Sequence, residues 1–315
     1  MTEPAAERPP VTIVVPAHNE ATVLGRCLRA VLRDAEPAEF AVLVVSNGST
    51  DGTVARAREL ATSLGHPIDV LDIAAASKIA ALRAAETRVA ASAPGVTRIY
   101  LDADVVLTTH AARLLAQALR GDEPRLAMAR VDIDASASSW LVRQYYRAWT
   151  STGYIDRQDA GSGVFALNSA GVARVGPLPD VINDDGYVAR RFGRDEKIIV
   201  AATFQAYAAR SAAALVRRRA RIVNGNRQLD ALLPLDSPAL GSAGGSGQGG
   251  NLLAAVRGRR LPATSALVFI ALTALARALA AWRRLTGSHA LWSTDTTTRT
   301  DTTTPTDSAT GRAQP

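Results

Sequence analysis

Short apolar runs alternate with segments of helical periodicity over the first 130 residues. Four runs are mostly β-branched and read as strands: 11–15, 40–45, 68–73 and 98–101. After the first run, apolar residues recur at intervals of three to five from Val23 to Leu32, which predicts an amphipathic helix. Apolar strands joined by helices predict an α/β fold, with a mostly parallel central sheet flanked by helices on both faces.

The pattern changes after about residue 131. A longer helical stretch runs from about Ala135, and the segment "GSGVFAL" leads into a short strand. The segment "DVINDDGYVARRF", two short strands and a basic helix over 211–223 complete this half. Without regular alternation, it is expected to be an α+β half that covers a site built on the first half. One domain over 11–235 therefore divides into halves 11–131 and 132–235.

Three segments lie outside this domain. Residues 236–250 form a Gly/Ser-rich linker by composition, and flexible or disordered ends are expected over 1–10 and 289–315. Between them, 251–288 forms an apolar and basic helix whose core, 261–282, has about the length that spans a bilayer. Arg277 lies inside it and further arginines flank it, so it either spans the membrane, lies in the interface or docks on the domain. Membrane contact or docking is favoured over a full span.

The charge and the cysteine content bear on the partners of the protein and on its cellular compartment. The chain has 36 basic and 29 acidic residues, a net charge of +7, and all but two of the basic residues are arginine. Codon bias in a GC-rich genome and anionic partners both explain this excess. The single cysteine, Cys27, excludes an internal disulfide and falls within an apolar helical stripe, where packing is its default role. A reducing cytoplasm fits this cysteine content.

Polar clusters follow three of the predicted strands. They are "PAHNE" at 16–20, "SNGSTDG" at 46–52 and "DAD" at 102–104. Because the carboxyl ends of parallel strands meet at one edge of a sheet, the three clusters are expected to form a single site.

Two of these clusters suggest specific chemistry. If the extended conformation persists, Asp102 and Asp104 project to the same side, and two close carboxylates suit a hard cation such as Mg²⁺ or Mn²⁺. An exposed acidic turn is the plain alternative. Asp51 either caps the helix that follows it or belongs to a loop whose amides bind an anion or nucleotide.

Six segments in order carry a resemblance to a known family. They are "VTIVVPAHNEATVLGRCL", "VLVVSNGSTDGT", "SKIAALRAA", "YLDADV", "GSGVFAL" and "DVINDDGYVARRF". Together they resemble a family 2 glycosyltransferase of the GT-A fold over residues 11–226. The resemblance implies transfer of a sugar from a nucleoside-diphosphate sugar, such as a UDP- or GDP-sugar, to an acceptor hydroxyl. It also implies inversion at the anomeric carbon and a divalent metal, Mn²⁺ or Mg²⁺.

The resemblance assigns roles on the donor side. Asp104 is the implied metal ligand, and Asp102 approaches the metal or the ribose. The implied nucleotide-sugar pocket includes Pro16, His18, Glu20, Asn47, Asp51 and Lys78. The family commonly has an aspartate where this chain has Ser46, which leaves the base uncertain.

On the acceptor side, Asp184 and Asp185 are the implied catalytic pair, with Asp185 as the general base. Two acidic residues that merely begin a helix are the plain alternative. The loop Gly161, Ser162 and Gly163 would approach the sugar or the acceptor, although a simple turn into a strand also explains it.

A basic cluster is expected beside the diphosphate. This chain lacks the glutamine-arginine-tryptophan signature of many relatives, but Arg218 and Arg221 keep its three-residue spacing and would share one helix face. A solvated basic face is the alternative.

Two other classes of function fit the sequence less well. A nucleotidyltransferase would carry a glycine-rich phosphate loop after the first strand, where this chain has "PAHNE". A nucleic-acid-binding protein has no need of acidic pairs, which repel phosphate, so no nucleic acid is expected. The acceptor is left open among a lipid, a polysaccharide, a small metabolite and a protein, with a lipid-linked or polysaccharide hydroxyl named first. The apolar C-terminal segment favours peripheral membrane contact at the inner face of the cell membrane.

Overall fold

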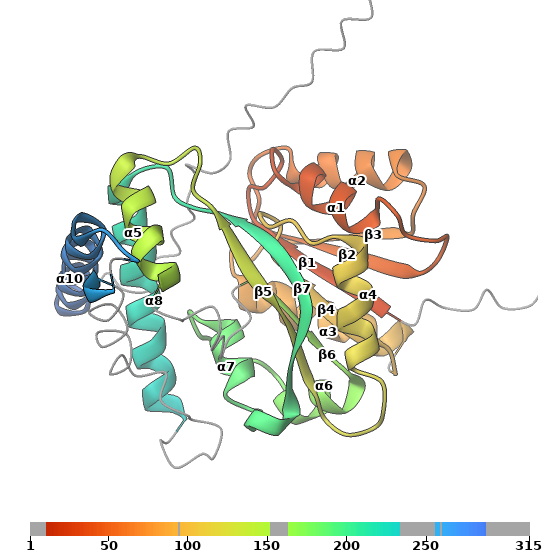
Figure 1. Ribbon diagram of the computed structural model, residues 1–315. Helices are drawn as coiled ribbons and strands as arrows, with labels where there is room; N and C mark the ends of the chain where they lie inside the picture. Colours follow the sequence, from red (N-terminus) through yellow and green to blue (C-terminus); the bar gives the residue numbers. More distant parts are fainter. Residues whose placement is uncertain (1–10, 94, 152–162, 234–255, 259, 288–315) are drawn as a thin grey trace, which may run out of the picture.

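A computed structural model describes residues 11–93, 95–151, 163–233, 256–258 and 260–287. Its centre is a seven-stranded sheet in the order β3-β2-β1-β4-β6-β5-β7 (Figure 1). The strands are β1 (Val11–Ala17), β2 (Phe40–Asn47), β3 (Ile68–Ile73), β4 (Thr97–Leu101), β5 (Leu126–Asp134), β6 (Val164–Leu167) and β7 (Lys197–Tyr207). The four strands predicted from the first half are all present.

Most neighbouring strands run parallel. β1 pairs in parallel with β2 and β4, β2 with β3, and β5 with β7. Only β6 runs against its neighbours β4 and β5. The predicted fold class, a mostly parallel sheet flanked by helices, is confirmed.

Helices cover both faces of the sheet. The helices are α1 (Leu24–Leu32), α2 (Thr53–Ser63), α3 (Lys78–Ser92), α4 (Thr109–Ala118), α5 (Trp140–Ser151), α6 (Ser169–Val175), α7 (Asp184–Ala189), α8 (Ala212–Leu232), α10 (Ala263–Leu285) and the short 3₁₀ helix η1 (Arg194–Glu196). Alternate residues of β1 face opposite layers: Ile13 and Val15 pack with α1, α2 and α4, whereas Val14 packs with α3 and α7. Both faces of β1 are therefore buried, as its apolar run predicts.

Three elements differ from the sequence prediction. β5 was not predicted, because its polar residues Arg130 and Asp132 interrupt an alanine-containing run of low β-propensity. The two short strands expected before the basic helix are one eleven-residue strand, β7. Helix α8 continues to Leu232 instead of ending near residue 223, since packing against α7 and α10 offsets the low helix propensity of its "NGN" segment.

The apolar C-terminal helix predicted from the sequence is present as α10. It lies beside α5 and α8, at one side of the sheet (Figure 1). Within 251–288, the helix begins at Ala263 and ends at Leu285. The expected linker over 236–250 and the expected flexible segments 1–10 and 289–315 lie outside the described residues.

Candidate active site

The polar clusters meet where the strand order reverses. β1 is followed in space by β2 and β3 on one side and by β4 on the other. Pairing of β1 with β4 stops at Val14 and Tyr100, although β1 continues to Ala17 beside β2. The two strands therefore separate at their carboxyl ends, which is where open α/β sheets bind their ligands. Pro16 lies in this stretch, past the last pair between β1 and β4.

The "DAD" segment forms a turn. β4 ends at Leu101, and the N–H of Val105 donates to the carbonyl of Asp102 at 3.3 Å. The extended geometry that would project both carboxylates to the same side therefore does not persist through Asp104, because the chain must turn toward α4. The two carboxylates remain electrostatically close, since Asp104 helps to raise the pKa of Asp102. Behind the turn, the buried thiol of Cys27 contacts the carbonyl of Asp102 at 3.7 Å, so its predicted packing role is confirmed.

One lysine joins the two halves of the domain. Lys78 is the first residue of α3, which begins after Ser77, whose side chain accepts from the N–H of Ala80 at 3.2 Å. Its Nζ lies 2.7 Å from Oδ1 of Asp102 and 2.9 Å from Oδ2 of Asp184. The lysine thus connects the end of β4 with the start of α7.

The charges of this cluster are strongly coupled. Burial raises the pKa of Asp102 to about 6; Lys78 opposes this shift, while Asp184 and Asp104 add to it. Burial disfavours the charged form of Lys78, but attraction to Asp102, Asp184 and Asp185 outweighs it and raises the pKa of the lysine. The ammonium therefore stays charged among several carboxylates.

Helix α8 brings a second cation to the same carboxylates. Burial and the neighbouring Arg218 lower the pKa of Arg221, against the attraction of Asp102, Asp184 and Asp104. Arg221 is thus within electrostatic range of the whole acidic cluster. Arg218 lies one turn earlier, and its Nη1 donates to the carbonyl of Tyr207 at 3.4 Å.

The two aspartates of α7 have different surroundings. Asp184 is only 5% exposed and is paired with Lys78. Asp185 is half-buried, and its Oδ1 accepts from the N–H of Gly186 at 2.7 Å. Asn183 also accepts from this N–H and caps the helix.

Polar residues of α8 hold α7 in place. Nδ2 of Asn183 donates to Oδ1 of Asn226 at 2.7 Å, and the N–H of Ile182 donates to Oε1 of Gln228 at 2.9 Å. A Cβ at Gly225 would lie 3.1 Å from Cβ of Asn183, so a glycine permits this close approach. These positioning residues were missed, and the polar "NGNRQ" run inside an otherwise helical segment was the signal that could have revealed them.

The loop after β1 is tied to the loop after β2. Nδ1 of His18 donates to the carbonyl of Asn47 at 2.6 Å. Asn19, in the left-handed region with φ 55°, accepts from the N–H groups of Thr50 and Asp51 at 2.8 and 3.3 Å. Nδ2 of Asn47 is buried and has no hydrogen-bond partner among the described residues, so this donor is left for a ligand.

The remaining residues of the predicted pocket have structural contacts. Asp51 accepts from the N–H of Thr53, the first residue of α2, at 2.9 Å and from that of Ala21 at 3.3 Å, so it joins the two loops at the start of this helix. Glu20 is buried, and its N–H donates to Oγ1 of Thr53 at 2.8 Å. Ser46 is buried and donates to Oγ of Ser49 at 3.1 Å.

Gly163 approaches the cluster closely. Its φ is 101°, and its carbonyl accepts from the N–H of Asp102 at 2.9 Å. A Cβ at this position would lie 3.1 Å from Oδ2 of Asp102. A side chain here would be strained and would crowd the carboxylate. Gly161 and Ser162, the other members of the predicted loop, lie outside the described residues.

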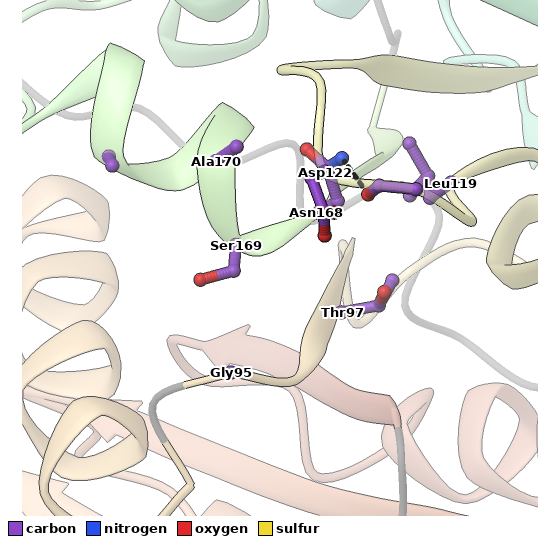
Figure 2. Close-up of a pocket in the computed structure, with 9 residues that line it drawn as sticks. Gly95, Thr97, Leu119, Asp122, Asn168, Ser169 and Ala170 are labelled. Carbon is purple, nitrogen blue, oxygen red and sulfur yellow. Dashed lines mark hydrogen bonds between the residues drawn. The ribbon is translucent and has the colours of Figure 1, made fainter.

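A hollow of about 470 Å³ lies at the other end of the sheet (Figure 2). It is bordered by Thr97 at the start of β4, whereas Asp102 follows the end of that strand. Its buried Asn168 accepts from the N–H groups of Gly171 and Arg125 and donates to the carbonyls of Gly121 and Glu123. With its polar atoms engaged in this way, Asn168 has a structural role, and the cluster around Lys78 is the better candidate site.

The chain is similar to known glycosyltransferases. Over 56 residues, the chain is 43% identical to "Glycosyltransferase AglE" of Haloferax volcanii, a match that covers 18% of each chain. The mannosyltransferase PcManGT from Pyrobaculum calidifontis, solved with GDP-Man and Mn²⁺, is similar with a TM-score of 0.55 and 22% identity, over 90% of this chain and 86% of that one. S. aureus TarS 1-349, solved with UDP, is similar with a TM-score of 0.50 and 12% identity, over 72% and 66% of the two chains.

At these identities, the solved structures establish a shared GT-A-like fold. The model of the family described as "Glycosyl transferase family 2" matches residues 12–178, which include β1, the "DAD" turn and Lys78. The chain therefore belongs to glycosyl transferase family 2.

Proposed function

We propose that this glycosyltransferase moves a sugar from a UDP- or GDP-sugar to an acceptor hydroxyl, with inversion at the anomeric carbon. The observation that carries the proposal is the pairing of Lys78 with Asp102 on the donor side and Asp184 on the acceptor side, 2.7 and 2.9 Å away. A donor and an acceptor that met at this point would both border the same charged cluster.

The nucleotide would lie over the separated ends of β1 and β2. Pro16, His18 and Glu20 would form one wall, and Asn47 and Asp51 would contribute from the opposing loop. The unpaired, buried Nδ2 of Asn47 is suited to a carbonyl oxygen of a base, which is an acceptor. The nucleotides in the two similar structures, GDP-Man in PcManGT and UDP in TarS, support the class of donor.

Asp104 and Asp102 would hold a divalent metal, Mn²⁺ or Mg²⁺. Among the described residues, no group of three or more His, Cys, Asp or Glu side chains could hold a metal ion alone. The pair nevertheless fits such an ion, because its oxygen donors are hard and because several carboxylates crowd around one ammonium. When bound, the ion would neutralise charge on the diphosphate.

Asp185 would act as the general base. It would take the proton of the acceptor hydroxyl as that oxygen bonds to the anomeric carbon. On the opposite side, the bond from this carbon to the diphosphate oxygen breaks, and the nucleoside diphosphate leaves with the electron pair. Asp184 suits this role less well, because it is 5% exposed and paired with Lys78. Arg221 and Arg218 would stabilise the charge that develops on the leaving group.

The acceptor would be a lipid-linked or polysaccharide hydroxyl, reached in the cytoplasm at the inner face of the cell membrane. A helix of 23 residues, α10, adjoins the domain and is long and apolar enough to cross a membrane by length and composition. Its place beside α8, the helix that carries Arg221, supports an acceptor that comes from the membrane side.

Isothermal titration tests the donor site. The purified chain would be titrated with UDP, GDP and their sugar conjugates, with and without Mn²⁺. We expect metal-dependent binding of one nucleotide, and loss of the metal dependence in Asp104→Asn. Asp122→Asn, which borders the hollow at the other end of the sheet, serves as the control. Binding that is unaffected by both Mn²⁺ and Asp104→Asn would contradict the proposed metal site.

A further inference from the structure

We propose that α10 is an interfacial anchor: one face locks onto the catalytic domain and the opposite face lies in the surface of an anionic lipid bilayer. This role of α10 holds whichever sugar the domain transfers. Apolar side chains lie on both the domain side and the exposed side of the helix.

The domain side of α10 is tightly held. Phe269, Ala276 and Ala280 are buried, and the ring centroids of Phe269 and Tyr145 are 5.0 Å apart. Near the start of the helix, Oγ of Ser265 donates to Oε1 of Gln144 in α5 at 2.7 Å. These contacts fix which side of α10 faces the domain.

The opposite face is apolar and exposed. Its five large side chains are between 54% and 87% exposed: Leu267, Ile270, Leu275, Trp282 and Leu285. At about 100° per residue, they fall within an arc of about 140°, with exposed alanines Ala271, Ala274 and Ala278 near its middle. A helix that merely covers a soluble domain turns polar residues outward, so this face requires an apolar partner.

The charge around this face identifies that partner. Between Ser237 and Thr294 the sequence has six arginines, no lysine and no acidic residue. Arg260 is exposed just before the start of α10, Arg277 is exposed in its second half, and Trp282 lies at the end where Arg283 and Arg284 follow. Arginine at the edge of an apolar helical face and tryptophan near its end suit the headgroup level of a bilayer. An anionic lipid surface offers both the apolar layer and the negative charge.

The helix is held in the plane of that surface. Its first turn is bonded to α5 through Ser265 and Gln144, and its last turn to α8, where Nη1 of Arg284 donates to Oδ1 of Asn224 at 2.6 Å. Crossing the bilayer would break these bonds or draw α5 and α8 into hydrocarbon. Of the three alternatives for this segment, the double attachment favours a helix that lies in the interface.

Sedimentation of the full-length chain with lipid vesicles tests the apolar face. We expect binding to phosphatidylcholine vesicles that contain phosphatidylglycerol, and a loss of roughly tenfold or more in Leu267→Glu/Ile270→Glu. The matched control is Leu232→Glu, an exposed leucine in the last turn of α8. Equal binding by the double variant and the wild type would overturn the proposal. So would a lipid-free dimer that the double variant dissociates, because a second copy of the chain would then cover this face.

The contribution of the arginines and the orientation of α10 in the bilayer need separate measurements. Arg257→Gln/Arg260→Gln is expected to weaken binding to the anionic vesicles, whereas Arg29→Gln/Arg58→Gln, exposed in α1 and α2, leaves it unchanged. Equal binding to vesicles of phosphatidylcholine alone would contradict the anionic partner. Alkaline carbonate extraction of cell membranes should release the chain, and retention would show a helix that spans the bilayer.

Discussion

Nζ of Lys78 lies 2.9 Å from Oδ2 of Asp184, a residue 106 positions further along the chain. The same nitrogen lies 2.7 Å from Oδ1 of Asp102. Since Asp184 is buried and Asp102 is partly so, neither carboxylate is well solvated, and their mutual repulsion is offset by this one ammonium. The two halves of the domain are therefore held together at the site by charge.

Removing this cation should destabilise the fold. We expect Lys78→Met to lower the free energy of unfolding by about 2–3 kcal/mol, because it leaves two facing carboxylates without their counter-charge. Lys78→Arg keeps the charge and should cost about 1 kcal/mol or less. Urea unfolding at neutral pH measures both. Equal midpoints for Lys78→Met and the wild type would mean that the pair adds nothing to stability.

Substitution of the two aspartates of α7 should affect activity and stability differently. Asp185→Asn is expected to lower kcat by roughly 10²- to 10⁴-fold without changing donor binding or the unfolding midpoint, as removal of a general base predicts. Asp184→Asn should lower the midpoint, because Lys78 loses a partner. Transfer rates, donor titration and unfolding are compared for both variants. A kcat in Asp185→Asn within a few-fold of the wild type would assign the base elsewhere.

An ion pair outside the site should make stability depend on pH. Arg113 bonds both oxygens of Glu39, at 2.6 and 2.8 Å, and this contact lowers the pKa of Glu39 below its ordinary value of 4.5. The folded chain therefore holds the proton of Glu39 less tightly than the unfolded chain does. The stabilisation is complete above the ordinary pKa and is lost as the pH falls through the lowered value.

Glu39→Gln isolates this contribution. We expect the wild type to exceed Glu39→Gln in unfolding free energy by about 1 kcal/mol near pH 6, with the difference shrinking progressively as the pH falls below 4.5. Chemical unfolding over this pH range measures the difference. A gap that persists or widens at the acidic end would show that the stabilisation has another source.

The pattern of apolar residues and the position of the polar clusters predicted most of the structure of the first half of the domain. The strand runs of β1 to β4 are mostly apolar, and their carboxyl ends had to bring "PAHNE", "SNGSTDG" and "DAD" to one edge. The pairing of Lys78 with both Asp102 and Asp184 could not be predicted in the same way. It depends on how α3 and α7 sit against the sheet, and no local pattern encodes a contact between residues so far apart.

The second half was less predictable for the same physical reason. Polar residues interrupt β5, and the "NGN" segment of α8 has low helix propensity, so tertiary contacts decide both elements. The turn at Asp102 could not be predicted, because spacing alone does not show where a strand ends. Asp51 lies at the start of α2 and contacts Thr53 and Ala21, although Gly52 is the N-cap of this helix.

Helix α8 has three partners at once. It places Arg221 within electrostatic range of the carboxylates, bonds the start of α7 through Asn226 and Gln228, and bonds α10 through Asn224. Inserting one residue after Arg221 would rotate every later side chain by about 100°, so all three of these amides would lose their partners together. The number of residues in α8 between Arg221 and these amides is therefore constrained by all of these contacts. The spacing of residues along α8 therefore sets the positions of Arg221, of α7 and of α10 relative to one another.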